Sequence, residues 1–550
     1  MSALRPERIW IGALVVVVAL VVVLSVADAR KDSVTADEPL HVAAGLAQAG
    51  HGGWVLNLEN PPLAKELFGR VGRFAGARDG PISFRSYFRS CQDALFRNAG
   101  GVSVETVLAA ARAVTIGFFV LLVVATYAAA GGGVPGFLGA AMVAGQAAFF
   151  PHGHLATADV PFAALGVAAV AATFRLRERP SPGNAFLAAL LLALAALTKF
   201  TGLLLLPVAA FLFLLPGPAG LEGRRRHVIA LAVGLPLLAS VLAAGLLRFW
   251  NPPSPRESLG VLSGLYRLPP ADRARIEAIG AVDAASARYA AGLLVNLRHA
   301  EAGRQTWYLG TVTGHPSAAY HAVALLVTAP AIWLVLVAAG GVLAAGPGAP
   351  FRARALLLAG ALVFLLSLPG PRIGIRHVLL PAALISAGAA AALAARVSPR
   401  VALLGVAMAL SPLALGRTIG REGLAARLFV RPAVADSNLD WGQDLLRLDR
   451  ELSSRGLKAN ALAIAYFGGD EPARRLPAAA DLLRGGSLEG RSLLAVSRQL
   501  LLVGPEAALD PEGVPGARAA VAAARDGRAR FLFRAGTSID VFEIQPGGSR

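Results

Sequence analysis

The first side chains able to do chemistry lie in the stretch TADEPLHVAAG, residues 35–45, directly after a long apolar run. Asp37, Glu38 and His41 stand close together there. A carboxylate at this place could take the proton from an acceptor hydroxyl, a step that contributes about 10² to 10⁴-fold to a rate. Thr35 and Glu38 also have the spacing of a helix capping box, and Asp37 could be an N-cap. The two interpretations are compatible, and the local sequence favours neither.

Further acids, cations and imidazoles follow at five places in the chain. Singly, each has a structural explanation, because Arg and Lys at helix ends often reach the membrane interface and Asp159 could cap a helix that has Pro161 in its first turn. Together, carboxylates and cations at one surface suit a reaction that needs a base and an anion clamp. The groups are Glu59 and Lys65 in NLENPPLAKEL, Arg112, His152, His154 and Asp159 in PHGHLATADVP, Lys199 in LTKFTG, and Arg372, Arg376 and His377 in GPRIGIRHVLLP.

The composition places these groups in a membrane protein. Of the 550 residues 55% are hydrophobic and only 16% are charged, whereas soluble chains carry about 25% charged residues. The net charge of +18 does not predict a nucleic-acid partner, because much of the Arg lies in short loops between apolar blocks, as the positive-inside rule requires. The single cysteine, Cys91, excludes an intrachain disulfide and a multi-Cys metal site.

Apolar blocks of about membrane-spanning length recur along the chain. The first, residues 9–27, follows Arg5 and Arg8 and is longer than a signal-peptide core, so we interpret it as a retained span with a cytoplasmic N-terminus. The others lie near 107–130, 134–150, 160–174, 184–198, 200–216, 228–247, 322–345, 355–368, 378–395 and 401–415.

The span count depends on Lys199, which interrupts the block 184–216. A charge at the bilayer centre costs about 2.5 to 3.5 kcal/mol on the translocon scale, so we divide the block into two short spans with Lys199 in the turn. This gives eleven spans. The loops RLRERPSPG, GRRRH, FRAR and RVSPR then all fall on the cytoplasmic side, and the charged groups described above gather on the outer side.

The prediction is therefore a polytopic α-helical protein with a transmembrane module at 1–418 and a C-terminal periplasmic α/β domain at 419–550. The module has large outer loops at 28–106 and 250–321. In the C-terminal domain, WGQDLLRLDRELSSRG predicts a helix, and ALAIAYFG, RSLLAVS, QLLLVG and SIDVFEI predict strands.

Such a surface could transfer a sugar from a lipid phosphate. A carboxylate would accept the proton of the acceptor hydroxyl, and Arg or Lys would stabilise the departing phosphate. Carboxylates would also stabilise the positive charge of an oxocarbenium-like centre that lies between them. No glycine-rich phosphate loop indicates the use of a soluble nucleotide.

Several motifs resemble the GT-C glycosyltransferases, in particular the protein O-mannosyltransferase-like family 39 and the related lipid A aminoarabinose transferases. DEPLHVAAG followed by NLENPPLAKEL resembles their first outer loop, HGHLATADVPFAAL their second acidic motif, and TKFTGLLLLP their turn between the fifth and sixth spans. YLGTVTGHPSAAYHAVALLVTAP, RIGIRHVLLP and DSNLDWGQDLLRL with AYFGGDEP resemble bacterial members.

The resemblance implies an inverting transferase that uses a polyprenyl-phosphate sugar at the periplasmic face of the bacterial inner membrane. Asp37 would be the acceptor-side base, Glu38 its support and Asp159 the second acid. Donor-phosphate binding falls to Lys65, Arg112, Lys199 and Arg376, and acceptor or sugar contacts to His41, Glu59, His154, His377 and Tyr320. The chain departs from the family where relatives carry an aromatic pair and a Lys, since it has Tyr320-His321 and Thr328.

Two other functions remain open. A transporter or flippase for a lipid-linked or anionic solute would also use membrane charges, but we find no inverted repeat. A non-catalytic cell-envelope binding protein could use an exposed Trp441 with Asp440 and Asp444, although a packed Trp beside a capped helix fits the same residues. The expected partners are the lipid-linked donor, the bilayer and a lipid, glycan or protein acceptor. The sequence assigns no definite cofactor; Asp37, Asp159 and the histidines are compatible with a divalent metal, but no ligand spacing demands one.

Overall fold

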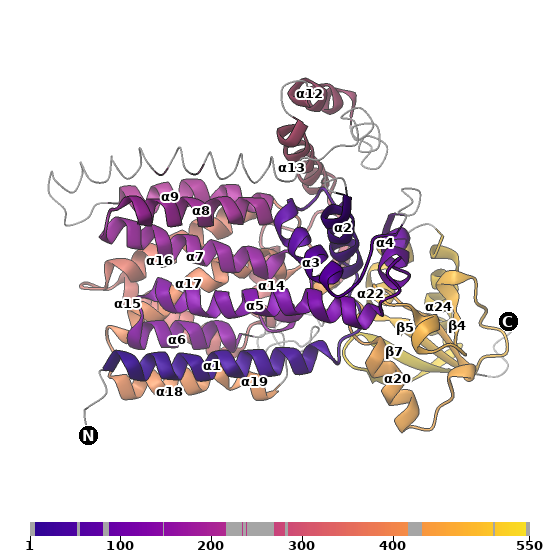
Figure 1. Ribbon diagram of the computed structural model, residues 1–550. Coiled ribbons are helices and arrows are strands. Elements are labelled where there is room, and N and C mark those ends of the chain that lie inside the picture. The colour runs from indigo at the N-terminus through magenta and orange to yellow at the C-terminus, as the bar shows by residue number, and fades with distance from the viewer. Residues whose placement is uncertain are drawn as a thin grey trace.

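The computed structural model describes residues 6–51, 56–80, 87–146, 148–215, 269–280, 284–415, 432–509 and 512–545, with Gly234 and Leu238. The predicted span at 228–247, the loop GRRRH and the first part of the outer loop 250–321 lie almost wholly outside these residues. In Figure 1, long helices run side by side at the left, and a small sheet packs at their right-hand end. The N-terminus lies at the end far from this sheet.

Apolar helices form the bundle. Within the described residues, four are long and apolar enough to cross a membrane, or five if one bent pair counts as a single span, and four shorter apolar helices accompany them. The helices are α1 (Pro6–Ala29), α5 (Val104–Ala130), α6 (Gly133–Ala144), α7 (Asp159–Glu178), α8 (Pro182–Thr198), α9 (Leu205–Leu214), α14 (Tyr320–Thr328), α15 (Ala331–Ala345), α16 (Phe351–Ser367), α17 (Leu379–Ala394), α18 (Pro399–Leu410) and α19 (Pro412–Leu415).

Small residues let the bundle pack closely around α17, which contacts α5, α6, α7, α15 and α16. A Cβ added at Gly340 of α15 would lie only 2.5 Å from the Cα of Ala389 in α17. Small residues at such crossings allow backbones to approach, which is the usual basis of helix packing in membranes.

Two breaks in the bundle bear on the predicted spans. The block at 184–216 divides at Lys199, as predicted: α8 ends at Thr198, and the 3₁₀ helix η3 (Phe200–Leu204) leads into α9. The block at 322–345, predicted as one span, instead bends by 119° between α14 and α15. Pro330 explains the break, because it has no N–H for a helical bond and disfavours helix in the residue before it.

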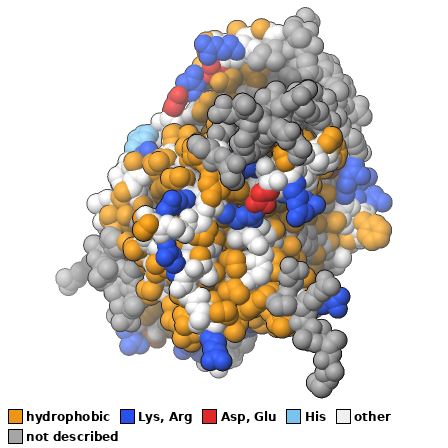
Figure 2. Space-filling view, turned by 90° about the vertical axis from the view of Figure 1, so that its left-hand side faces the viewer, with side chains coloured by type: hydrophobic (Ala, Val, Ile, Leu, Met, Phe, Trp, Pro, Cys, Tyr) orange, Lys and Arg blue, Asp and Glu red, His pale blue; other side chains and the backbone are white. Residues whose placement is uncertain are grey.

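The end of the bundle far from the sheet carries basic side chains, and Figure 2 shows them among apolar ones on this face. They come from the loops predicted to be cytoplasmic, and Arg175, Arg179, Arg354, Arg396 and Arg400 lie there. This distribution agrees with the loop charges used in the sequence analysis.

Shorter elements cover the other end of the bundle. They are α2 (Glu38–His51), α3 (Pro62–Phe74), α4 (Tyr87–Phe96), η2 (Pro151–His154), α12 (Pro270–Gly280), α13 (Ala284–Ala302), η4 (Ile375–Val378) and the hairpin β1 (Thr306–Tyr308) with β2 (Thr311–Thr313).

The C-terminal part is an α/β unit with a five-stranded sheet in the order β4-β3-β5-β7-β6. Strands β4, β3 and β5 are parallel, and β7 and β6 continue the sheet antiparallel. The strands are β3 (Leu462–Ala465), β4 (Ala480–Asp481), β5 (Leu493–Ser497), β6 (Ala529–Ala535) and β7 (Ile539–Ile544); the helices are η6 (Asp436–Asn438), α20 (Leu445–Ser454), η7 (Ala459–Ala461), α21 (Pro472–Arg475), η8 (Leu482–Arg484), α22 (Arg498–Val503), α23 (Pro505–Ala508) and α24 (Val514–Arg525).

The predicted helix and three of the four predicted strands of this unit are confirmed as α20, β3, β5 and β7. The strand predicted at QLLLVG is wrong, because these residues form α22 and the residue after it. Leu500 and Val503 are buried at helical spacing there. A short apolar run cannot by itself distinguish a buried strand from a buried helix turn.

Candidate active site

Residues 30–37 between α1 and α2, which the sequence places on the outer side and which we call the first outer segment, are joined to the C-terminal unit by backbone hydrogen bonds. The amide of Ala36 donates to the carbonyl of Trp441 at 2.9 Å, and the amide of Gly469 donates to that of Val34 at 3.0 Å. The contact is so close that a Cβ added at Gly469 would lie 2.2 Å from the carbonyl oxygen of Thr35. Only glycine fits at that position, so the C-terminal unit fixes where the segment before α2 runs.

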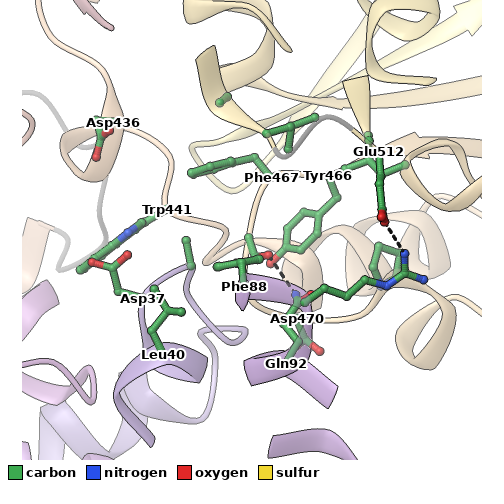
Figure 3. Close-up of a pocket in the computed structure, with 18 of the residues that line it drawn as sticks. Asp37, Leu40, Phe88, Gln92, Asp436, Trp441, Tyr466, Phe467, Asp470 and Glu512 are labelled. Atoms are coloured by element: carbon green, nitrogen blue, oxygen red, sulfur yellow. Dashed lines mark hydrogen bonds and ion pairs between the residues drawn. The ribbon is translucent and has the colours of Figure 1, made fainter. Parts of the chain in front are cut away.

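A pocket of about 350 Å³ opens at this junction. Its walls come from the start of α2, from α4, from η4 and from the C-terminal unit, as Figure 3 shows. A concave site with apolar walls and a few convergent polar groups is the usual form of a small-ligand site. The lining includes Asp37, Phe88, Gln92, Trp441, Phe467 and Asp470.

Asp37 is the predicted acid that faces this pocket. Its carboxylate forms an ion pair with Arg376 of η4, and 28% of its side chain is exposed. Burial alone would raise the pKa of Asp37, but the charge and hydrogen bond of Arg376, together with other positive groups nearby, outweigh burial, and the pKa lies below its ordinary value. The same guanidinium stands 4.2 Å from the centre of the Trp441 ring, as a cation–π contact. Asp37 is thus held ionised at the pocket wall.

Glu38 is directed away from the pocket and is fully buried. It accepts two hydrogen bonds from Arg112, at 2.8 and 2.7 Å, and one each from the amides of Thr35 and Ala156, both at 2.9 Å. The Thr35 bond is the predicted capping-box contact. The other three N–H groups of Arg112 donate to the carbonyls of Ala29, Asp32 and Ser33. The Glu38–Arg112 pair therefore ties the first outer segment to α5.

Lys65 is also committed to the backbone. Its ammonium group is fully buried in α3 and donates to the carbonyls of Leu56, Asn57 and Asn60 at 3.1, 2.5 and 2.7 Å. Burial lowers its pKa well below the ordinary Lys value. These contacts shape the NLENPP loop, and they occupy the group predicted to bind the donor phosphate.

Asp159 and Lys199 form the second charged pair near the site. Their side chains meet at 2.5 Å, and Asp159 also accepts a bond from the Thr157 hydroxyl at 3.1 Å. The charges of Arg376 and His377 act on Asp159, so η4 links this pair to Asp37. The structure thus brings Asp37, Asp159, Lys199 and Arg376 into one electrostatic neighbourhood.

The predicted histidine contacts divide into two kinds. His154 is bonded through Nε2 to Asp32 at 2.8 Å and is structural. Burial lowers the pKa of His41 to about 4, so this ring is neutral at physiological pH. Among the described residues, Nδ1 of His41 and Nε2 of His377 have no hydrogen-bond partner.

Glu59 and Tyr320 lie outside this group. Glu59 pairs with His299 of α13 at 3.2 Å and is half-buried. Tyr320 is fully buried, and its hydroxyl accepts a bond from Asn438 at 3.1 Å. Neither side chain lines the pocket.

The sequence analysis missed the part of the pocket that the C-terminal unit supplies. The segment DSNLDWGQD was the available signal, but Trp441, expected to be exposed if it bound sugar, is only 2% exposed. Asp440 accepts bonds from the amides of Gly442 and Gln499, and Asp444 from those of Thr537 and Ser538. The packed interpretation of this segment is therefore the correct one.

The described residues contain no group of three or more His, Cys, Asp or Glu side chains arranged to hold a metal ion.

Residues 86–243 match the model of the family described as dolichyl-phosphate-mannose-protein mannosyltransferase. The predicted family resemblance is confirmed. The match covers α4 to α9, including Arg112, Asp159 and Lys199, so this segment is similar to a family of membrane glycosyltransferases. No curated protein matches the chain by sequence.

Solved glycosyltransferase structures align with the chain at low identity. The oligosaccharyltransferase AglB of Archaeoglobus fulgidus, in complex with an inhibitory peptide and a dolichol phosphate, aligns with 14% identity and a TM-score of 0.48 over 98% of this chain and 75% of its own. Its apo crystal structure aligns over 73% of this chain and only 55% of its own length, with 14% identity and a TM-score of 0.45.

Two other structures give lower scores. The Pmt1–Pmt2 protein O-mannosyltransferase of S. cerevisiae, bound to the sugar donor, gives 17% identity and a TM-score of 0.31 over 45% of this chain and 34% of its own. ArnT from Cupriavidus metallidurans, bound to undecaprenyl phosphate, gives 14% identity and a TM-score of 0.29 over 98% and 99%. All these TM-scores are below 0.5, so the family resemblance rests on the matched segment.

Proposed function

We propose that this protein transfers a sugar from a polyprenyl-phosphate donor to an acceptor hydroxyl, with inversion, at the periplasmic face of the bacterial inner membrane. The observation that carries the proposal is the ionised Asp37 carboxylate at the wall of a pocket, paired with Arg376. The matched family supports the donor class, since its description names a sugar on a polyprenyl phosphate.

In this mechanism Asp37 accepts the proton of the acceptor hydroxyl as that oxygen attacks the anomeric carbon. The bond from this carbon to the phosphate oxygen breaks, and the polyprenyl phosphate leaves with its negative charge. Cations near the leaving group stabilise that charge. Lys199 and Arg376 suit this role, because the N–H groups of Lys65 and Arg112 donate hydrogen bonds to other groups of the protein. Asp159 then orients Lys199.

The arrangement of charges favours a transferase over a transporter. The pocket is lined by residues of α2, of α4 and of the C-terminal unit, and these elements meet at one end of the helix bundle (Figure 1). Transporters place substrate and ion sites near the middle of the membrane, between repeated halves of the fold. We also expect Arg5, Arg8 and the basic loops to lie in the cytoplasm.

The test uses the purified full-length protein in detergent with a panel of labelled polyprenyl-phosphate sugars and cell-envelope extract as the acceptor source. The wild type should release polyprenyl phosphate, and Asp37→Asn should reduce the release by about 10² to 10⁴-fold. The variant must still fold and bind donor, as its melting temperature and donor binding would show. Equal release by both proteins removes Asp37 from the mechanism, and no release with any donor argues against a transferase.

A further inference from the structure

The turn η6 of the C-terminal unit docks directly onto the loop that carries Arg376. The backbone amide of Ile375 donates to Oδ1 of Asn438 at 2.8 Å. The side-chain Nδ2 of Asn438 in turn donates to the Tyr320 hydroxyl at 3.1 Å. Gly374 makes room for the turn, since a Cβ there would lie 2.1 Å from Oγ of Ser437. The residue that pairs with Asp37 is thus held from the C-terminal side.

Asp436, the first residue of this turn, has an unusual backbone conformation. Its φ is +58°, in the left-handed region that side-chain-bearing residues seldom adopt. Its amide donates to Oε1 of Gln499 at 2.9 Å, and its own Oδ1 accepts the amide of Ser437 at 2.6 Å. Strained residues of this kind cluster at functional sites when their surroundings lock them in place. The surroundings here fix both the backbone and one oxygen of Asp436.

The Asp436 carboxylate lines the same pocket as Asp37 and Arg376. In Figure 3, Asp436, Trp441 and Asp37 lie along one side of this pocket. Three carboxylates, those of Asp37, Asp159 and Asp436, act electrostatically on the one guanidinium of Arg376. The other titratable or charged groups that act on Arg376, Asp37 or Asp159 are His41, His152, Lys199, Arg304, Tyr320 and His377.

We propose that Asp436 is a positioning residue that acts through Arg376, so that the C-terminal unit completes the transferase site. The Trp441 ring lies against the guanidinium from the C-terminal unit, Asp436 lines the same pocket, and Asp37 pairs with the guanidinium from the first outer segment. Sharing Arg376 among several carboxylates limits how tightly it binds Asp37. Asp37 then stays ionised but keeps enough basicity to take a proton. This inference rests on the proposed function.

Loss of the Asp436 charge should leave Arg376 bound more tightly to Asp37. Asp436→Asn is the suitable variant, because Asn tolerates the left-handed conformation and its oxygen can still accept the Ser437 amide. We expect kcat to fall by about tenfold, as a weaker base accelerates proton transfer less, with the donor KM little changed. Asp526→Asn removes the same charge from an exposed position of the C-terminal unit and should leave kcat unchanged.

A double-mutant cycle with Arg376→Gln separates positioning from a merely structural role. If Asp436 acts through Arg376, Asp436→Asn should have almost no effect on the residual kcat of the Arg376→Gln protein. A structural role would give additive losses in kcat and a lower melting temperature. Asp436→Ala, which also adds backbone strain, should lower the melting temperature where Asp436→Asn does not.

The outcomes distinguish this inference from the proposed function. A wild type that releases no polyprenyl phosphate from any donor overturns both. An active wild type with an unchanged kcat in Asp436→Asn, or with additive losses in the cycle, overturns the inference alone and leaves the transferase intact.

Discussion

The amide of Ala36 donates a 2.9 Å hydrogen bond to the carbonyl of Trp441, and this contact sets the position of the residue that follows Ala36. Asp37 comes next in the chain and pairs with Arg376, whose guanidinium lies against the Trp441 ring. One residue of the C-terminal unit therefore supports both partners of the ion pair, one through its backbone and the other through its side chain.

Glu38 should matter to stability more than to chemistry. Its partner Arg112 is buried, so Glu38→Gln leaves a buried charge uncompensated and should lower the free energy of unfolding by about 3 to 5 kcal/mol. Thermal unfolding in detergent measures this. Glu451→Gln breaks an exposed pair with Arg455 and should cost at most about 1 kcal/mol. A Glu38→Gln protein with the wild-type melting temperature and no activity would make Glu38 catalytic.

Lys65 and Lys199 should respond differently to replacement by Met. Lys65→Met removes a donor from three carbonyls, of which that of Asn57 still accepts the Asn60 amide, at about 1 to 3 kcal/mol for each group left unsatisfied, so its melting temperature should fall. Lys199→Met should instead lower kcat, by about 10²-fold, and its melting temperature should also fall, because the buried Asp159 carboxylate loses its partner. Donor kinetics and melting curves of both variants test this pair. A Lys65→Met protein that keeps its melting temperature but reacts poorly with the donor would contradict this prediction and make Lys65 a ligand of the donor phosphate.

Gly374→Ala should displace the turn η6 from the Arg376 loop. The backbone of Gly374 is extended and suits any residue, so the effect is a clash with the Ser437 hydroxyl alone. A displacement of about 1 Å at a catalytic site can cost about 10²-fold in rate. Adding Ser437→Ala removes the clashing atom and should recover most of the kcat, while Ser437→Ala alone should be nearly neutral. Failure of this rescue would mean that the clash does not act through Ser437.

Asp440 should make stability depend on pH. Burial raises the pKa of its carboxyl to about 7, so the folded protein keeps a proton that the unfolded chain releases near pH 3.8. Between these values the folded state binds more protons, and the free energy of unfolding falls as pH rises, by about 4 kcal/mol in all, before it levels off above pH 7. Unfolding at pH 5 and pH 8 measures the slope, which Asp440→Asn should flatten and the exposed Asp526→Asn should not change. An unaltered slope in Asp440→Asn would assign the pH dependence to another group.

The sequence predicted the elements with strong periodicity or a clear break. The division at Lys199 was predictable because a charge is costly within a span, and β3, β5 and β7 because their β-branched and apolar runs end in turn residues. The sequence analysis missed the bend at Pro330, because the apolar run continues through that residue, although a proline inside a helix is itself a signal for a break.

The sequence analysis named several residues that the structure brings near the pocket, but it missed the part of the pocket that the C-terminal unit supplies. Asp37, Asp159, Lys199 and Arg376 come together as their shared surface implied. The sequence could not show that Lys65 and Arg112 donate to backbone carbonyls. A cation that is buried against the protein and a cation that binds a ligand have the same residue type and the same neighbours in the sequence. The sequence analysis missed Asp436 for a different reason, since its backbone amide donates to the side chain of Gln499, 63 residues away, and no local pattern encodes that contact.

The bond from the Leu446 amide to the Ser33 hydroxyl joins residues 413 positions apart, and it has a consequence for biogenesis. At about 5 to 20 residues per second, the ribosome needs about 20 to 80 s to make the chain between them. During that time the segment Asp32–Ala36, which follows the first helix, has already been synthesised, but the partners that later fix it have not. Asp37, the proposed base, therefore acquires its final setting late in synthesis, and a chain that ends before residue 446 lacks the contact between Leu446 and Ser33.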